Sequence, residues 1–285
     1  MAPPWTWRGQ GWPTLAALPL PLRWPATCWK SVRARKRFGQ HFLTDEAVLQ
    51  RMADVIRLGP NDQVVEIGPG TGALTAVLHE APARYLAVEI DRDLAPELTR
   101  RFPGVEVVNA DVLRVSLEEL LGSQSWRVVG NLPYNISTPL LVRLFAHADR
   151  IRDMHFMLQR EVALRLAAVP GTKAWGRLTV LAQYHCQVEL LFEVAPESFS
   201  PPPKVWSAVA RLVPRGSKLP LKDPDMLDLV LRHAFSGRRK RLGNALKSLS
   251  MPWNDIDVDE AARPDQLSVK DFVALANAVP AEPAP

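Results

Sequence analysis

Residues 63–72 read QVVEIGPGTG, and this stretch decides the fold. Its first five positions are mostly apolar and β-branched, which predicts a buried strand over 63–67. Gly68, Gly70 and Gly72 follow at once and predict a tight loop, because glycine adopts turn conformations that other residues avoid. The pattern after Gly72 predicts a helix over 73–79. A strand, a glycine loop and a helix in succession are typical of an α/β fold.

The same alternation continues toward the C-terminus. Strands are predicted over 85–90, 105–109, 127–130 and 154–158, and helices over 94–101, 161–168 and 177–185. Strands that alternate with helices at this interval predict a parallel sheet with helices on both faces. The segments 188–194 and 205–212 are predicted to be strands that form an antiparallel pair at the edge of that sheet.

Upstream of the first strand, the sequence predicts a helix that begins after Thr44. The Thr44 hydroxyl can cap the helix, and Asp45 and Glu46 in the first turn suit the positive end of its dipole. Apolar residues follow at helical spacing as far as Ile56.

The pattern changes after Pro214-Arg215-Gly216. Helices are predicted over 224–235, 239–249 and 267–278, with no strand among them. We therefore expect an α/β domain over 32–213 and a small all-helical domain over 214–285. Residues 1–31 contain five of the nine tryptophans, and their one apolar run is broken by prolines. This segment is predicted to be a disordered extension rather than a targeting sequence.

Positive charge is concentrated in two places. The first 44 residues hold seven of the 35 Lys and Arg residues and no acid, so the other 28 face all 30 Asp and Glu residues. The basic runs are 33–37 and 238–241. Such clusters suggest a polyanionic partner, although a charge run can also be an ordinary solvated face.

Several classes of protein are disfavoured by composition. The two cysteines lack CxxC spacing and the six histidines form no HExxH motif, which argues against a disulfide scaffold or a protein-built metal site. No apolar run approaches the roughly 18 residues of a membrane span. We therefore expect a cytoplasmic protein with neither a metal nor a membrane partner.

The glycine loop predicts a nucleoside site. Its spacing is GxGxG, not the GxGxxG of dinucleotide binding, and no P-loop lysine follows, which favours a ligand without a pyrophosphate. Carboxylates end the next two strands, where they can meet ribose hydroxyls and an adenine amino group. A glycine loop alone marks a turn about as often as a site, but the ordered set favours a ligand. The candidate residues are Glu66, Gly68, Gly70, Gly72, Glu89 and Asp111.

This arrangement resembles the S-adenosylmethionine site of Rossmann-like class I methyltransferases. The resemblance implies that cofactor and a seven-stranded, mostly parallel sheet.

A second motif follows the fourth strand. Asn131-Leu132-Pro133-Tyr134 resembles the (D/N/S)PPY-type motif of methyltransferases that modify exocyclic amines of nucleobases. Adenine N6 is a poor nucleophile because its lone pair is delocalised. We expect the Asn131 side-chain oxygen and the Leu132 carbonyl to accept its hydrogens and place it for transfer. Pro133 would fix the turn, and Tyr134 would stack on a base taken out of its helix. Alone, such a motif can equally be a strand-ending turn.

Four further segments identify a family. RKRFGQHFL at 35–43, QREVA at 159–163 with PGTKAWGRL at 170–178, FSPPPKVWSAV at 199–209 and FSGRRKRL at 235–242 appear in order. Together they resemble the small-subunit ribosomal RNA adenine N6,N6-dimethyltransferases of the KsgA type. The resemblance implies that Gln40, His41 and Leu43 close over the cofactor.

The family resemblance also implies a substrate. It predicts methylation of the N6 atoms of two adjacent adenosines near the 3′ end of 16S rRNA in the 30S particle, by a monomer with a role in ribosome biogenesis. Contacts to RNA are expected from Arg35, Lys36, Arg37, Arg238, Arg239, Lys240 and Arg241.

Three alternatives stay open. The nearest is a resistance-type methyltransferase of large-subunit rRNA, which shares the fold and the Asn-x-Pro-Tyr motif. A non-catalytic ribosome-assembly or transcription factor with the same fold is disfavoured by the intact motifs. An NAD-dependent oxidoreductase is disfavoured by the spacing of the glycine loop.

Overall fold

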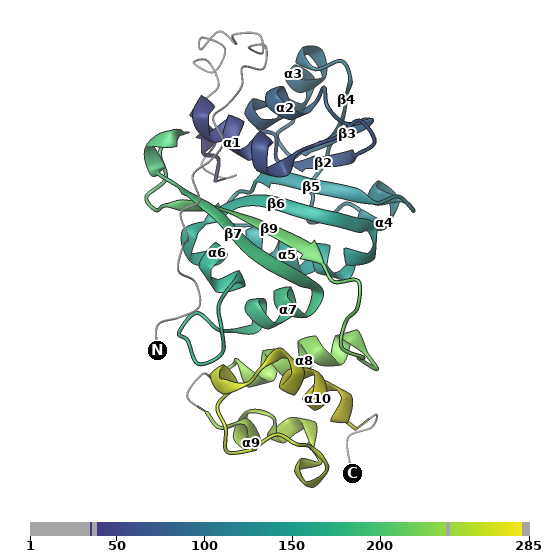
Figure 1. Cartoon of the computed structure of the whole chain (residues 1–285), viewed down its shortest axis with the longest axis vertical. Helices are drawn as coiled ribbons and strands as arrows, with labels where there is room; N and C mark the ends of the chain where they lie inside the picture. The colour runs from purple at the N-terminus through teal and green to yellow at the C-terminus, as the bar shows by residue number, and fades with distance from the viewer. Residues whose placement is uncertain (1–34, 36–38, 238–239, 281–285) are drawn as a thin grey trace, which may run out of the picture. The chain divides into compact units, whose positions relative to one another are not determined.

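One seven-stranded sheet organises the computed structural model, which describes residues 35, 39–237 and 240–280 (Figure 1). Its order is β4-β3-β2-β5-β6-β9-β7. The five strands from β4 to β6 run parallel, whereas β9 is antiparallel to both β6 and β7. The strands are β2 (Gln63–Ile67), β3 (Arg84–Glu89), β4 (Val105–Asn109), β5 (Trp126–Asn131), β6 (Ile151–Gln159), β7 (Cys186–Val194) and β9 (Ser207–Pro214).

This topology confirms the predicted parallel sheet with an antiparallel pair at one edge. From β2 the chain proceeds outward through β3 and β4, and it then returns to β5 on the other side of β2. The strand order therefore reverses between β2 and β5. In open α/β sheets, ligands bind in the crevice at the carboxyl ends of the two strands that flank such a reversal.

Helices connect the strands and cover both faces of the sheet. They are α1 (Glu46–Ile56), α2 (Ala73–Leu78), α3 (Leu94–Arg101), α4 (Leu117–Leu121), α5 (Ser137–Ala146), α6 (Arg160–Leu166), α7 (Arg177–His185), α8 (Pro224–Ala234), α9 (Leu242–Ala245) and α10 (Val269–Ala278).

Successive strand side chains point to opposite faces. Val65 and Val128 join a hydrophobic cluster with Leu141 of α5, whereas Val64 is buried on the opposite face. Met52 of α1 is buried outside that cluster. The central strands are therefore covered on both sides, which explains their continuous apolar sequence.

The cap of α1 differs from the prediction by one residue. Asp45, not Thr44, is the N-cap: its Oδ1 accepts hydrogen bonds from the backbone N–H groups of Ala47 (3.0 Å) and Val48 (3.3 Å). The Thr44 hydroxyl instead donates to the carbonyl of Ser198 (3.2 Å), and the Ser198 hydroxyl donates to Asp45 Oδ2 (2.9 Å). The prediction was wrong because the Thr44 hydroxyl forms its hydrogen bond with Ser198, a residue far away in the sequence.

That partner belongs to a small ribbon that the sequence analysis did not predict. β1 (Phe42–Leu43) pairs antiparallel with β8 (Phe199–Ser200). The ribbon ties the segment before α1 to the segment before β9. A two-residue strand is too short to show the alternation of apolar and polar residues by which strands are predicted from a sequence.

The last helices share a core with the α/β part. α8 packs on α10, which also contacts α7, and Leu231 and Phe272 belong to the same hydrophobic cluster as the sheet (Figure 1). The helix predicted over 239–249 is reduced to α9 and a 3-10 turn, because the N–H groups of Leu242 and Gly243 donate to the carbonyls of Ala262 and Glu260. In the described part of the chain, no helix is long and apolar enough to cross a membrane.

Candidate active site

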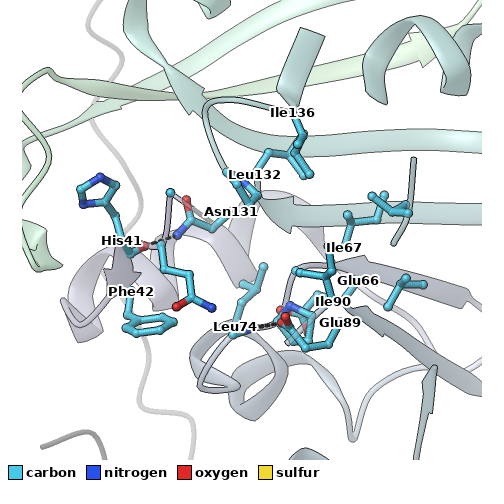
Figure 2. Close-up of a pocket in the computed structure, with 18 of the residues that line it drawn as sticks. His41, Phe42, Glu66, Ile67, Leu74, Glu89, Ile90, Asn131, Leu132 and Ile136 are labelled. Carbon is cyan, nitrogen blue, oxygen red and sulfur yellow. Dashed lines mark hydrogen bonds between the residues drawn. The ribbon is translucent and has the colours of Figure 1, made fainter. Parts of the chain in front are cut away.

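A cavity of about 330 Å³ opens at the carboxyl ends of β2 and β5, where the strand order reverses. Its lining combines the glycine loop, the end of β3, the segment after β4, the Asn131–Tyr134 motif and residues 39–43. Figure 2 shows Glu66, Glu89 and Asn131 gathered around it. The structure therefore brings together candidate residues of both motifs, of which Glu66 and Tyr134 lie 68 positions apart in the chain.

The glycine loop needs its glycines for two different reasons. Gly70 has φ +60°, and a Cβ there would lie 3.1 Å from the ring of Phe42. Gly72 has φ +81°, and its Cβ would lie 2.6 Å from the Phe102 ring. Side chains rarely adopt positive φ, and close approach leaves no space for one. Both positions therefore require glycine, but only Gly70 lines the cavity, whereas Gly72 packs against Phe102 outside its lining.

Glu89 braces this loop from the end of β3. Its two carboxylate oxygens accept hydrogen bonds from the backbone N–H groups of Gly70 (2.9 Å) and Asp91 (2.8 Å). Burial raises the pKa of Glu89, while these N–H groups oppose the rise. Each oxygen retains a further acceptor position, so the carboxylate can brace the loop and still accept a ligand hydroxyl.

Asp111 lines the cavity just after β4. Its Oδ1 accepts a hydrogen bond from the backbone N–H of Leu113 (2.9 Å), and Arg114 approaches its Oδ2 at 3.4 Å. The turn at Asp111 thus points the carboxylate in a defined direction at the cavity wall.

Glu66 lies at the cavity floor and is only 1% exposed. The hydroxyls of Thr75 (2.5 Å) and Tyr85 (2.7 Å) both donate to its Oε2. Burial is the largest influence and raises the pKa of Glu66 to about 7, against the lowering effect of the two hydroxyls. Its carboxyl thus joins β2 to α2 and β3 below the loop.

Asn131 is held in one orientation by residues 39–43. Its Nδ2 donates to the carbonyl of His41 (2.9 Å), the interaction drawn in Figure 2. Among the described residues, no hydrogen bond uses Asn131 Oδ1 or the Leu132 carbonyl. Two acceptors that an amino group requires are therefore available at the cavity edge.

Tyr134 is fixed at both its hydroxyl and its ring. The hydroxyl forms a 2.7 Å hydrogen bond with Ser207 Oγ, and the ring stacks on His41 with centroids 5.6 Å apart. His41 Nδ1 in turn donates to the carbonyl of Pro201 (2.7 Å). Burial raises the pKa of Tyr134, so its phenol stays neutral at physiological pH. The sequence predicted a base against this ring, and the structure places His41 on one face of it.

The match to known proteins agrees with this geometry. Residues 31–279 fit the model of a family described as ribosomal RNA adenine dimethylase. The chain belongs to that family.

Curated relatives of the dimethylase family are close in sequence. A protein named ribosomal RNA small subunit methyltransferase A from Pseudomonas fluorescens is 49% identical over 260 residues, which are 89% of this chain and 96% of the relative. Its namesake from Pseudomonas aeruginosa is 50% identical over 254 residues, covering 86% and 94%. The prediction of an enzyme that methylates ribosomal RNA is confirmed.

Solved structures confirm the predicted Rossmann-like methyltransferase fold. A dimethyladenosine transferase from Plasmodium falciparum aligns with TM-score 0.71 and 26% identity, covering 82% of this chain and 96% of that one. The 23S rRNA methyltransferase ErmE aligns with TM-score 0.64 and 27% identity, covering 84% and 99%. The fold is thus shared with a dimethyladenosine transferase and with a 23S rRNA methyltransferase.

Residues 39–43 form part of the cavity lining. Gln40 Oε1 accepts the backbone N–H of Arg35 (2.8 Å), and Gln40 Nε2 approaches Asp91 at 3.4 Å. Leu43 is buried in the ribbon with β8. The Arg35 guanidinium forms ion pairs with Asp91 and Asp93, so here it anchors the segment to the cofactor edge rather than facing outward.

The other predicted RNA contacts are only partly described. Lys240 and Arg241 are exposed at the start of α9. Lys36, Arg37, Arg238 and Arg239 lie outside the described residues. No cluster of three or more His, Cys, Asp or Glu side chains is placed to hold a metal ion within residues 35, 39–237 and 240–280.

Sequence reasoning missed two positioning residues. Ser207, which hydrogen-bonds Tyr134, lies in the FSPPPKVWSAV segment, whose match to the family could have drawn attention to it. Asp91, which is 3% exposed and pairs with Arg35, follows Glu89 by two residues and could have been found from its place at the end of β3.

Proposed function

We propose that this chain dimethylates N6 of two adjacent adenosines near the 3′ end of small-subunit ribosomal RNA, in the 30S particle. The curated relatives are named for the small ribosomal subunit, which supports this target over the large one. The observation that supports the chemistry is the amide of Asn131, which lines the cavity: its Nδ2 is held by the His41 carbonyl, and no hydrogen bond among the described residues uses its Oδ1. We further expect a cytoplasmic monomer with a role in ribosome biogenesis.

The cavity suits S-adenosylmethionine. A phosphate-free nucleoside needs close backbone approach, which the loop supplies at Gly68 and Gly70, because both line the cavity and neither carries a Cβ. Glu89 has acceptor capacity for ribose hydroxyls, and Asp111 stands where it can accept from an adenine amino group. The cofactor supplies an electrophilic methyl group. The GxGxG spacing of the loop differs from the GxGxxG spacing that places a pyrophosphate at a helix N-terminus.

Asn131 and Leu132 would position the nucleophile. Each of the two hydrogens of adenine N6 can donate to one acceptor, Asn131 Oδ1 or the Leu132 carbonyl. This pairing favours pyramidal nitrogen and directs its lone pair into the cavity. The methyl group of S-adenosylmethionine is already a good electrophile. Asn131 and Leu132 therefore need only to orient the adenine amine and to disfavour other orientations of the base. No general base is assigned.

Tyr134 would hold the target base against its free face. The bond to Ser207 and the stack on His41 fix the ring before any base arrives, which lowers the ordering cost of binding. The helical segment 214–285, with the basic run 238–241, is proposed to recognise the RNA around the target through phosphate contacts.

Methyl transfer to purified ribosomal particles tests this function. Undermethylated 30S particles, incubated with the chain and labelled S-adenosylmethionine, should gain label that maps to two adjacent adenosines, while 50S particles should gain none. Asn131→Ala should retain cofactor binding, because the glycine loop, Glu89 and Asp111 are unchanged, yet lose at least 100-fold in rate, as when one oriented hydrogen-bonding group is removed. Label on 50S particles alone would favour the large-subunit alternative, and near-normal turnover by Asn131→Ala would refute its role.

A further inference from the structure

An exposed aromatic side chain lies one residue before Ser207, the residue that positions Tyr134. Trp206 is 50% exposed and the neighbouring Val205 is 45% exposed. Lys204 is also exposed, and no ion pair within the described residues uses its ammonium group. Trp206 directly precedes Ser207, the hydrogen-bond partner of Tyr134. A large exposed ring thus lies one residue from a positioning residue of the active site, and an exposed lysine lies two residues before it.

The backbone that carries Trp206 is fixed on both sides. Upstream, Phe199 and Ser200 pair with β1, and the Pro201 carbonyl accepts a hydrogen bond from His41. Downstream, the Trp206 carbonyl accepts the backbone N–H of Arg160 (2.9 Å), and Ser207 begins β9. The ring is therefore presented by a rigid frame, and a partner that stacks on it meets little ordering cost.

Charge distinguishes among possible partners for this ring. Arg160, whose backbone N–H bonds to the Trp206 carbonyl, is paired with Glu193, whereas Lys204 forms no ion pair within the described residues. An aromatic face together with a free ammonium group complements an unpaired nucleobase and its phosphate. A purely apolar protein partner would leave Lys204 without a counter-charge.

We propose that Trp206 is a stacking platform for an unpaired nucleobase that flanks the target adenosine, and that Lys204 contacts the phosphate of that nucleotide. The proposal rests on the proposed function, because it supposes that a single-stranded RNA enters at Tyr134. It adds a site outside the catalytic motif: the base that reacts contacts Tyr134, while its neighbour rests on Trp206. The platform would fix the register of the strand.

Kinetics and fluorescence test the platform separately. Trp206→Ala should raise KM for undermethylated 30S particles at least fivefold, equivalent to about 1 kcal/mol, with little change in kcat. Trp206→Phe should restore most of the loss, because it keeps an aromatic face. Val205→Ala removes exposed apolar surface from the same loop and is the matched control, with KM expected to stay within twofold. Thermal unfolding of each variant should match that of the parent chain, since half of the ring is already in water.

A direct readout does not depend on activity. Tryptophan emission, compared between the parent chain and Trp206→Phe, should show a Trp206 component that a single-stranded oligoribonucleotide quenches and the corresponding duplex does not. An unchanged KM for Trp206→Ala, or an equal loss for Val205→Ala, would overturn the proposal. So would a Trp206 component that responds to 30S proteins stripped of RNA and not to the oligoribonucleotide. Failure of the parent chain to methylate 30S particles would instead count against the proposed function.

Discussion

Glu66 shows how a single buried carboxyl can set the pH dependence of stability. In the folded chain its pKa is about 7, because burial disfavours the charged form more than Thr75 and Tyr85 stabilise it. In the unfolded chain the same group titrates near its ordinary value of about 4.3. Between these values the folded state binds more protons, so this group's contribution to stability is present at low pH and is lost as pH rises toward 7 and beyond.

Glu66→Gln should therefore remove a pH-dependent cost. Glutamine keeps the shape and an acceptor oxygen for the two hydroxyls but carries no charge. Relative to the parent chain, the variant should gain up to ~3 kcal/mol in free energy of unfolding at pH 8 and little at pH 5. Urea titrations of both proteins between pH 5 and pH 8 measure the difference in free energy of unfolding. The contributions of the other titrating groups cancel in this difference. A difference that is constant with pH would contradict the assignment.

Among the elements, α1 begins at an N-cap, Asp45, whose side chain also bonds to Ser198 in a loop far away in the sequence. Asp45 accepts two backbone N–H groups of α1 and also the hydroxyl of Ser198, which precedes β8. One carboxylate therefore stabilises the helix start and ties it to the ribbon that covers the cavity. Loss of this group should affect both the helix and the closure of residues 39–43.

Asp45→Ala should lower the free energy of unfolding by about 1–2 kcal/mol, the usual cost of removing an N-cap. Asp45→Asn keeps an oxygen for the helix N–H groups and should retain most of the stability. Thr44→Ala should cost less, because the Thr44 hydroxyl makes one hydrogen bond to a carbonyl and caps nothing. Denaturant midpoints of the three variants provide the test, and a larger loss for Thr44→Ala than for Asp45→Ala would restore Thr44 as the cap.

The elements also show which structure a sequence can reveal. β2, α3 and β4 match their predicted residues, because each carries its periodicity and its breakers within a few positions. The ribbon of β1 and β8 was not predicted, and the helix expected over 239–249 was too long, since both are decided by hydrogen bonds to remote segments. The same limit applies in the site. Glu89 and Asn131 were found from local order, whereas the contacts of His41 with Tyr134 and Asn131 join residues about 90 positions apart.

At the scale of the whole molecule, the two basic runs have different positions. Arg35, at the first run, is paired with Asp91 and Asp93 beside the cofactor edge. Lys240 and Arg241, at the second, are exposed near the helical end of the chain, and no salt bridge in the described residues involves them. Positive charge that is already paired contributes little to RNA affinity, whereas free surface charge releases counterions when it meets phosphate.

The double variant Lys240→Ala/Arg241→Ala should therefore bind 30S particles more weakly and with a shallower salt dependence. Each lost phosphate contact lowers the slope of log affinity against log salt by roughly 0.7 for single-stranded RNA, so the slope should fall by about 1–1.5 between roughly 50 and 200 mM salt. Arg35→Ala is the matched control: it should weaken S-adenosylmethionine binding, because it frees residues 39–43, and leave the slope unchanged. A slope that changes for Arg35→Ala and not for the double variant would place the RNA at the opposite end of the molecule from the helical segment. Binding isotherms at four salt concentrations separate these outcomes, since the slope counts phosphate contacts independently of any loss of folded protein.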